Sequence, residues 1–160
     1  MKLILACVGR LKSGPEREIA LRYLTRAAAG ARAVGLTGVD MREFDESRGR
    51  RPEDRRAEEA KSLKSILPAG ARLVLFDERG TAATSAQFAA DIGRARDGGA
   101  PAYVLAIGGA DGFDQDFRAE AQMVVAFGAM TWPHQLARIM ATEQIYRATT
   151  ILAGHPYHRA

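Results

Sequence analysis

Cysteine, histidine and long apolar runs are all scarce in this chain of 160 residues, and each scarcity excludes a class of protein. Cys7 is the only cysteine, so an internal disulfide and a cysteine-based zinc site are excluded. The longest apolar run, residues 3–8, is too short to span a bilayer and is a poor core for a signal peptide. We therefore expect a cytoplasmic protein with no membrane partner.

Aromatic residues and net charge are also low, which leaves an ordinary globular composition. Aromatics make up 7% of the chain, against 47% apolar and 26% charged residues, so one domain spanning residues 1–160 is expected. Lysine and arginine number 23 against 19 aspartate and glutamate, which gives a net charge of +4. This modest excess tolerates a polyanionic partner and does not by itself require one.

Short apolar segments alternate with amphipathic or charged segments along the chain. The apolar segments, which predict strands, are residues 1–9, 34–44, 73–76, 103–107 and 123–130. The segments between them predict helices over 13–30, up to about 67, and over 85–96, 114–122 and 134–153. This alternation predicts an α/β fold in which a mostly parallel sheet is covered by helices on both faces.

Local signals predict where two helices begin and where one strand ends. Ser13 opens the sequence SGPE, which indicates a capping box, and Ser85 is a second helix cap. The strand 73–76 is expected to end at Asp77, with a turn around Arg79 and Gly80.

Three segments are expected to form a ligand pocket. In an open α/β sheet, ligands bind outside the carboxyl ends of the strands, and residues 76–80, 108–112 and 128–134 follow strands in this way. The middle segment, GGADG, matches neither the dinucleotide-binding glycine pattern nor the phosphate-binding loop of nucleotide hydrolases. A tight turn without a ligand explains its glycines equally well.

The three histidines all lie near the C-terminus, at positions 134, 155 and 158. His155 and His158 lack a third ligand of suitable spacing, so we predict no metal site. Together with Tyr157 and Arg159 they give the tail, residues 154–160, acid, base and phosphate-binding chemistry.

The last helix and the arginine cluster each allow two interpretations. The apolar side chains of residues 134–153 surround nearly the whole helix, which indicates a helix central to the core or shared with a second subunit. Glu143 and Arg147 lie one turn apart and predict an ordinary ion pair. Five arginines within residues 48–56 form a solvated face or contact phosphates.

Several segments together resemble one family across the whole chain. They are MKLILACVG-RLK, LFDERG, IGGADGF, TWPHQLARIMATEQIYRA and the terminal GHPYHR. With these motifs the chain resembles the RlmH family of ribosomal RNA pseudouridine N3-methyltransferases, which belongs to the SPOUT methyltransferases. The resemblance is dense over residues 105–159 and sparse over residues 34–67.

The resemblance implies a SPOUT fold and a methyl donor. It implies a C-terminal trefoil knot over about residues 73–153, a homodimer, and S-adenosyl-L-methionine bound in the knot. The residues implied to bind this cofactor are Phe76, Gly108, Gly109, Phe127, Gly128, Ala129, Met130, Thr131 and Trp132.

The resemblance also implies the reaction, methyl transfer to N3 of a pseudouridine in large-subunit (23S) ribosomal RNA within the ribosome. N3 carries a proton that must leave before attack, and His158 is the base we favour. Tyr157, His155 and Arg159 complete the implied catalytic set, placed beside the donor, with no metal. The alternatives are a SPOUT enzyme acting on another RNA, such as transfer RNA, a non-catalytic ribosome-binding module, and a generic nucleotide-binding protein.

Overall fold

A parallel sheet of five strands forms the centre of the molecule. The computed structural model describes residues 1–159. The strands are β1 (Lys2–Val8), β2 (Gly38–Phe44), β3 (Arg72–Ala82), β4 (Ala102–Ile107) and β5 (Met123–Ala126). Their order across the sheet is β2-β1-β4-β3-β5, and every neighbouring pair runs parallel. The predicted α/β class is confirmed.

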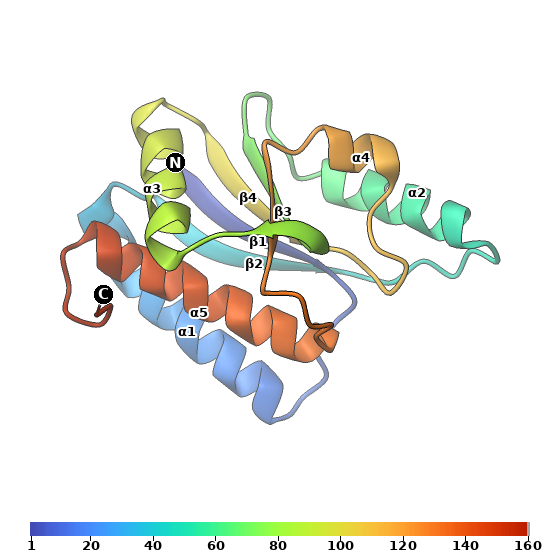
Figure 1. Ribbon diagram of the computed structural model, residues 1–160, viewed down its shortest axis with the longest axis horizontal. Coiled ribbons are helices and arrows are strands. Elements are labelled where there is room, and N and C mark those ends of the chain that lie inside the picture. Colours follow the sequence, from blue (N-terminus) through green and yellow to red (C-terminus); the bar gives the residue numbers. More distant parts are fainter. Residues whose placement is uncertain (160) are drawn as a thin grey trace.

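Helices cover both faces of the sheet, as Figure 1 shows. On one face lie α1 (Pro15–Ala31), α3 (Ser85–Asp97) and α5 (His134–Leu152), with α5 packed between the other two. On the other face lie α2 (Pro52–Lys64) and α4 (Gln115–Ala119). A short 3-10 helix, η1 (Arg32–Val34), links α1 to β2. The cavity described below lies at the carboxyl ends of the central strands.

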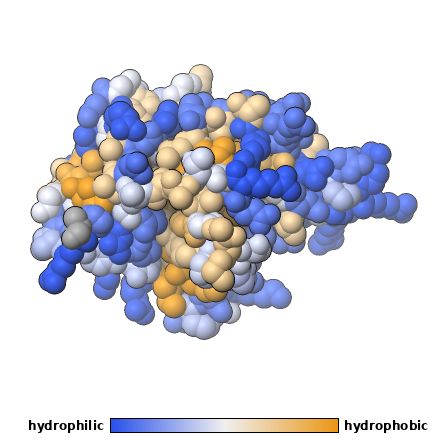
Figure 2. Space-filling view, in the orientation of Figure 1, coloured by the Kyte–Doolittle hydropathy of each residue, from blue (hydrophilic) through white to orange (hydrophobic). Residues whose placement is uncertain are grey.

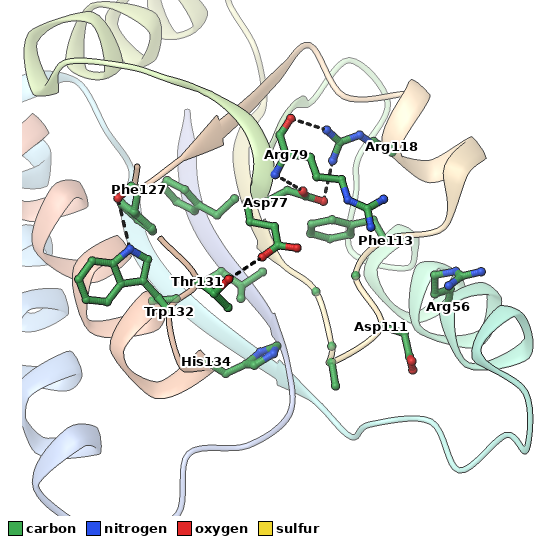
Figure 3. A pocket seen from close by; sticks show the side chains of 18 of the residues that line it. Arg56, Asp77, Arg79, Asp111, Phe113, Arg118, Phe127, Thr131, Trp132 and His134 are labelled. Carbon is green, nitrogen blue, oxygen red and sulfur yellow. Dashed lines mark hydrogen bonds and ion pairs between the residues drawn. The ribbon is translucent and has the colours of Figure 1, made fainter. Parts of the chain in front are cut away.

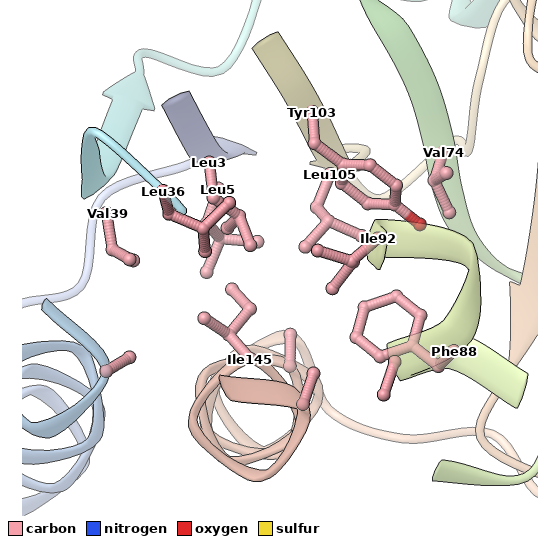
Figure 4. Close-up of a cluster of buried hydrophobic side chains, with 14 of the residues drawn as sticks. Leu3, Leu5, Leu36, Val39, Val74, Phe88, Ile92, Tyr103, Leu105 and Ile145 are labelled. Atoms are coloured by element: carbon pink, nitrogen blue, oxygen red, sulfur yellow. The ribbon is translucent and has the colours of Figure 1, made fainter. Parts of the chain in front are cut away.

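The core beneath α1, α3 and α5 is built from alternate residues of the buried strands. Figure 4 shows Leu3 and Leu5 of β1 with Tyr103 and Leu105 of β4 pointing toward Ile145 of α5. All five side chains are fully buried, which accounts for the continuous apolar runs in the sequence. A second, smaller core on the other face joins β1, β3 and β4 to α2 and α4.

Two buried titratable groups inside this framework have shifted pKa values. Asp91 of α3 accepts hydrogen bonds from Arg72, at 2.7 and 2.9 Å, and from the Tyr103 hydroxyl, at 2.8 Å. These donors hold the pKa of Asp91 below its ordinary value against the effect of burial. Cys7 lies fully buried in β1, where desolvation raises the pKa of its thiol to about 12.

Three local predictions were wrong in detail. The first helix has Gly14, not Ser13, at its N-cap and no side-chain capping bond, because Pro15 takes the first helical position. Thr84, not Ser85, caps α3, in a capping box with Gln87. The strand that was expected to end at Asp77 continues to Ala82.

The extension of β3 depends on Gly80. After an irregularity between Phe76 and Thr81, β3 pairs again with β5, Thr81 opposite Val125 and Ala82 opposite Ala126. A Cβ atom at Gly80 would lie 2.6 Å from the carbonyl carbon of Val125. Because glycine has no Cβ, the two backbones approach here, and β3 pairs with β5 again after the unpaired residues 77–80.

A buried ion pair fixes the N-terminal half of α5 to the carboxyl ends of β1 and β2. The Arg138 side chain is 3% exposed, and its Nη1 lies 2.6 Å from Oε1 of Glu43. Its Nη2 donates to the carbonyl oxygens of Val8, at 3.3 Å, and Gly9, at 3.0 Å. Glu43 also accepts from Arg17 and from the backbone N–H of Leu11. One arginine thereby fixes the helix whose N-terminus borders the cavity.

Candidate functional site

A cavity of about 700 Å³ opens where the three predicted segments meet. Its walls come from the extended β3, the glycine turn after β4, the segment between β5 and α5, and the first turns of α2 and α4. Figure 3 shows aromatic rings, carboxylates and guanidinium groups around the same space. A volume of this size suits a ligand of roughly 20 to 40 heavy atoms, with polar groups to orient it.

The glycine turn is held from below by α2. Asp111, at the tip of the turn, receives two hydrogen bonds from Arg55, at 2.6 and 3.0 Å. Glu59 is buried beneath Gly109, where a Cβ atom would lie 2.6 Å from its Oε2. Oε1 of Glu59 accepts from the backbone N–H of Ser47, at 3.1 Å. The turn is therefore a fixed part of the wall, and glycine is required at position 109 by contact.

Carboxylates of β3 form the wall on the β5 side. Asp77 lies 2.6 Å from Arg118 of α4 and also accepts from the backbone N–H of Arg79, at 2.8 Å. Glu78 accepts from the Thr131 hydroxyl, at 3.2 Å, a contact drawn in Figure 3. This second contact joins β3 to the segment before α5 and closes one side of the cavity.

The segment of residues 127–132 gives the cavity its apolar wall. The Phe127 ring stacks on Phe76, with centroids 4.5 Å apart, and the Trp132 Nε1–H donates to the carbonyl oxygen of Phe127, at 3.3 Å. Met130 is 72% exposed, and Gly128 has a φ of 104° that favours glycine. The segment therefore presents apolar side chains and free backbone groups to a ligand.

The structure brings nearly all the residues implied to bind the cofactor together. Eight of them line the cavity: Phe76, Gly108, Gly109, Phe127, Gly128, Met130, Thr131 and Trp132. Ala129 belongs to the same exposed segment but is not part of the lining. Residues from three distant stretches of sequence thus meet at one site.

The tail residues lie elsewhere. His155, Tyr157, His158 and Arg159 follow the C-terminus of α5, whereas the cavity borders its N-terminus at His134. Nineteen helical residues separate the two ends, which is about 28 Å at 1.5 Å per residue. Within one chain, the four tail residues do not meet the cavity.

The tail folds back on the C-terminal half of α5. The Tyr157 hydroxyl donates to Glu143, at 3.1 Å, and its ring packs on Tyr146, with centroids 4.7 Å apart. Arg147 pairs with Glu143, as predicted, lies over the Tyr157 ring and approaches Nδ1 of His158 to 3.4 Å. Burial and the bond to Glu143 raise the pKa of Tyr157 to about 12, so this phenol is protonated at neutral pH.

Sequence reasoning missed several residues of the cavity. His134 lies in the predicted pocket segment 128–134, was given no chemical role, and lines the cavity as the first residue of α5. Arg56 and Arg118 were missed, and only their spatial neighbours mark them as parts of a site. Asp77 lies in the predicted pocket segment 76–80, because it follows the apolar run of a strand, and it does line the cavity.

Neither a membrane span nor a metal cluster is found in residues 1–159. Each helix in this range is too short or too polar to cross a bilayer. The same range contains no group of three or more potential metal-ligating side chains.

Comparison with known proteins identifies the family to which this chain belongs. A family model described as "Predicted SPOUT methyltransferase" matches residues 1–158. The chain belongs to the SPOUT methyltransferase family, as its sequence motifs indicated.

Named relatives match this chain over its full length or nearly so. Three relatives carry the name "Ribosomal RNA large subunit methyltransferase H". The protein from Methylocella silvestris is 58% identical to this chain over 99% of both chains. Those from Xanthobacter autotrophicus and Rhodopseudomonas palustris are 54% and 51% identical, over 100% of both chains. Among solved structures, the SpoU methyltransferase AviRb from Streptomyces viridochromogenes is similar over 96% of this chain and 61% of that chain. Its TM-score is 0.42 and its sequence identity 14%.

Proposed function

We propose that this protein transfers a methyl group from S-adenosyl-L-methionine to N3 of a pseudouridine in large-subunit ribosomal RNA, on the assembled ribosome. The observation that carries the proposal is 58% identity over 99% of the chain with a ribosomal RNA large subunit methyltransferase H. The cavity supports it, because eight of the nine residues expected at the donor line one space. Such a protein works in the cytoplasm, where ribosomes are.

The cavity fits the donor by size and by chemistry. Apolar surfaces of Phe127, Met130 and Trp132 suit an adenine ring, and the free backbone groups of the glycine turn suit its polar edge. The donor supplies an electrophilic methyl group. The chain supplies orientation, since Glu78 and Thr131 hold the apolar segment against β3.

The chemistry left to the protein is proton removal and alignment. N3 of pseudouridine is a weak nucleophile until its proton is taken, so a base within hydrogen-bonding reach is required. Holding N3 in line with the methyl group provides much of the remaining rate enhancement. His158 is the proposed base, with Tyr157, His155 and Arg159 orienting the nucleotide.

A homodimer is proposed to bring this tail to a cavity. The two lie at opposite ends of α5 in one chain, so a second copy with its helix reversed would place its tail beside the first copy's cavity. Large apolar side chains suited to such an interface are exposed on α1, in the segment before α5 and near the start of α5: Ile19, Leu21, Met130, Trp132 and Leu136. Figure 2 shows apolar colouring on the surface where α1 lies.

A trefoil knot over about residues 73–153 is part of the proposal. The segment between β5 and α5 lies against the extended β3 and faces the glycine turn across the cavity. In a knotted chain these three segments would cross one another around the cavity.

The direct test is mass spectrometry of large-subunit RNA from cells lacking the protein. We expect one pseudouridine to lose the mass of one methyl group, and purified protein with methyl-labelled donor to restore it on ribosomes. Labelling of purified transfer RNA with ribosomes left unlabelled would assign the enzyme to another substrate. Failure to bind the donor in calorimetry would favour a non-catalytic ribosome-binding module.

Mixed dimers test the proposed role of the tail. His158→Ala and Gly128→Val should each abolish methylation, because one removes the base and the other fills the cavity at a φ that valine resists. Refolding them together at equal amounts should restore about a quarter of wild-type activity, since half the dimers then hold one intact site of two.

Two results would contradict the proposed role of the tail. An inactive mixture, with mixed dimers present by mass spectrometry, would show that the tail does not act on a partner's cavity. A His158→Ala variant with the wild-type rate between about pH 6 and 9 would show that His158 is not the base.

A further inference from the structure

Three arginine side chains line the cavity, and only one of them is paired within the protein. Arg118 lies 2.6 Å from Asp77 and donates to the carbonyl oxygen of Arg79. In residues 1–159, the guanidinium groups of Arg56 and Arg79 take part in no ion pair or side-chain hydrogen bond. Two cationic groups at the cavity are therefore available to an anionic ligand.

The availability of Arg56 contrasts with its neighbours on the same helix. Arg51 binds Asp54 through two contacts, at 2.8 and 2.9 Å, and Arg55 binds Asp111, at 2.6 and 3.0 Å. Arg56 is half-buried at the cavity wall and lies next in sequence to an arginine that holds the glycine turn. Its position is thus fixed by the helix, and its guanidinium forms no ion pair within the described residues, although its charge helps to lower the pKa of Asp111.

An aromatic ring lies on the same side of the cavity. Phe113 follows the glycine turn, and its Cε1 is 3.3 Å from the position a Cβ atom would take at Gly108. Figure 3 shows Arg79 from β3, Phe113 after the turn and Arg56 from α2 along this side of the cavity. Guanidinium groups beside an aromatic ring are the elements with which proteins hold single-stranded RNA.

We propose that Arg56 and Arg79 bind backbone phosphates of the substrate RNA next to the nucleotide that enters the cavity, and that Phe113 stacks on a neighbouring base. This inference rests on the proposed function and assigns the RNA-binding side of the site. A guanidinium forks onto two phosphate oxygens, and contacts from two separate elements suit a chain of phosphates better than one small anion. With a net charge of +4, a few placed arginines must hold RNA that the overall charge attracts only weakly.

The test uses charge-removing variants in the full-length protein. Arg56→Gln and Arg79→Gln should each raise the KM for ribosomes about 3- to 10-fold, and the double variant about 10- to 100-fold. Each should also lower the slope of log affinity against log salt concentration by about 0.7, the value for one phosphate contact on a single strand. The affinity for S-adenosyl-L-methionine, measured by calorimetry, should stay within about 2-fold of wild type.

Lys61→Gln is the matched control. Lys61 lies on the exposed surface of α2, outside the cavity, and its loss removes the same charge from the same helix. Its KM for ribosomes should change less than about 2-fold. Phe113→Tyr should retain the wild-type KM, whereas Phe113→Leu should raise it about 5-fold, because leucine fills the space without a stacking face.

Two outcomes would overturn the inference. If Arg56→Gln and Arg79→Gln change the KM no more than Lys61→Gln does, RNA does not contact these arginines. If they weaken donor binding as much as ribosome binding, they hold the donor's carboxylate. A wild-type protein without methylation activity would instead refute the proposed function, and RNA binding by the same variants would still test this inference.

Discussion

Arg138→Met is expected to destabilise the fold by about 3 kcal/mol, because it removes the nearest cation from the partly buried carboxylate of Glu43. That carboxylate keeps its bonds from Arg17 and the backbone N–H of Leu11. The carbonyl oxygens of Val8 and Gly9 lose a donor at the same time. The expected fall in Tm is about 10 °C for a chain of this length. Urea unfolding followed by circular dichroism gives the free energy of unfolding directly.

The control for this variant is Arg94→Met. Arg94 also pairs with a buried carboxylate, that of Asp91, but its own side chain is 71% exposed. Asp91 keeps its bonds from Arg72 and Tyr103, so the expected loss is below about 1 kcal/mol. Equal losses for the two variants would mean that the burial of Arg138 does not set its contribution.

Gly80→Ala is expected to lower methyl transfer about 100-fold while the protein stays folded at about 25 °C. The added methyl group would meet the backbone of β5 at Val124 and Val125, at 2.8 and 2.6 Å, so β3 and β5 must separate there. Asp77 and Glu78 would then move with β3, and the segment that Glu78 holds through Thr131 would move as well. Donor affinity by calorimetry and methylation kinetics measure the effect.

Gly30→Ala is the matched control, at a position where an added methyl group meets no other atom. Gly30 lies near the end of α1, and no atom lies within 4 Å of the position that a Cβ atom would take there. Alanine should therefore preserve activity and raise stability by about 0.5 to 1 kcal/mol. A Gly80→Ala enzyme with the donor affinity and rate of Gly30→Ala would show that close contact between β3 and β5 does not shape the cavity.

The fold could be predicted from the sequence where burial and periodicity agree. The runs at β1 and β4 are apolar at nearly every position, because both faces of a central strand are covered by helices. Such short, continuous apolar runs therefore predicted buried strands. The polar end of β3 gave the opposite signal. Residues 77–80 favour a turn locally, and they form an unpaired bulge, since Phe76 and Thr81 both pair with Val125. β3 continues past this bulge because Gly80 admits the backbone of β5, a contact between residues more than 40 positions apart.

The site was also predicted only where its signals are local in the sequence. Glycines and carboxyl ends of strands mark a pocket locally, so the three segments that form the cavity were found from the sequence. The buried pair of Arg138 and Glu43 spans 95 positions, and no local pattern predicts it. The separation of the tail from the cavity had a signal, since a helix over 134–153 already sets their distance.

Alkylation of Cys7 can be used to measure opening of the central sheet. The thiol is fully buried in β1, between β2 and β4, and its raised pKa of about 12 leaves almost no thiolate at neutral pH. Alkylating reagents therefore reach it only when the central strands part. Since the chain has no other cysteine, the extent of its alkylation measures opening of the sheet alone, in purified protein or in a crowded lysate.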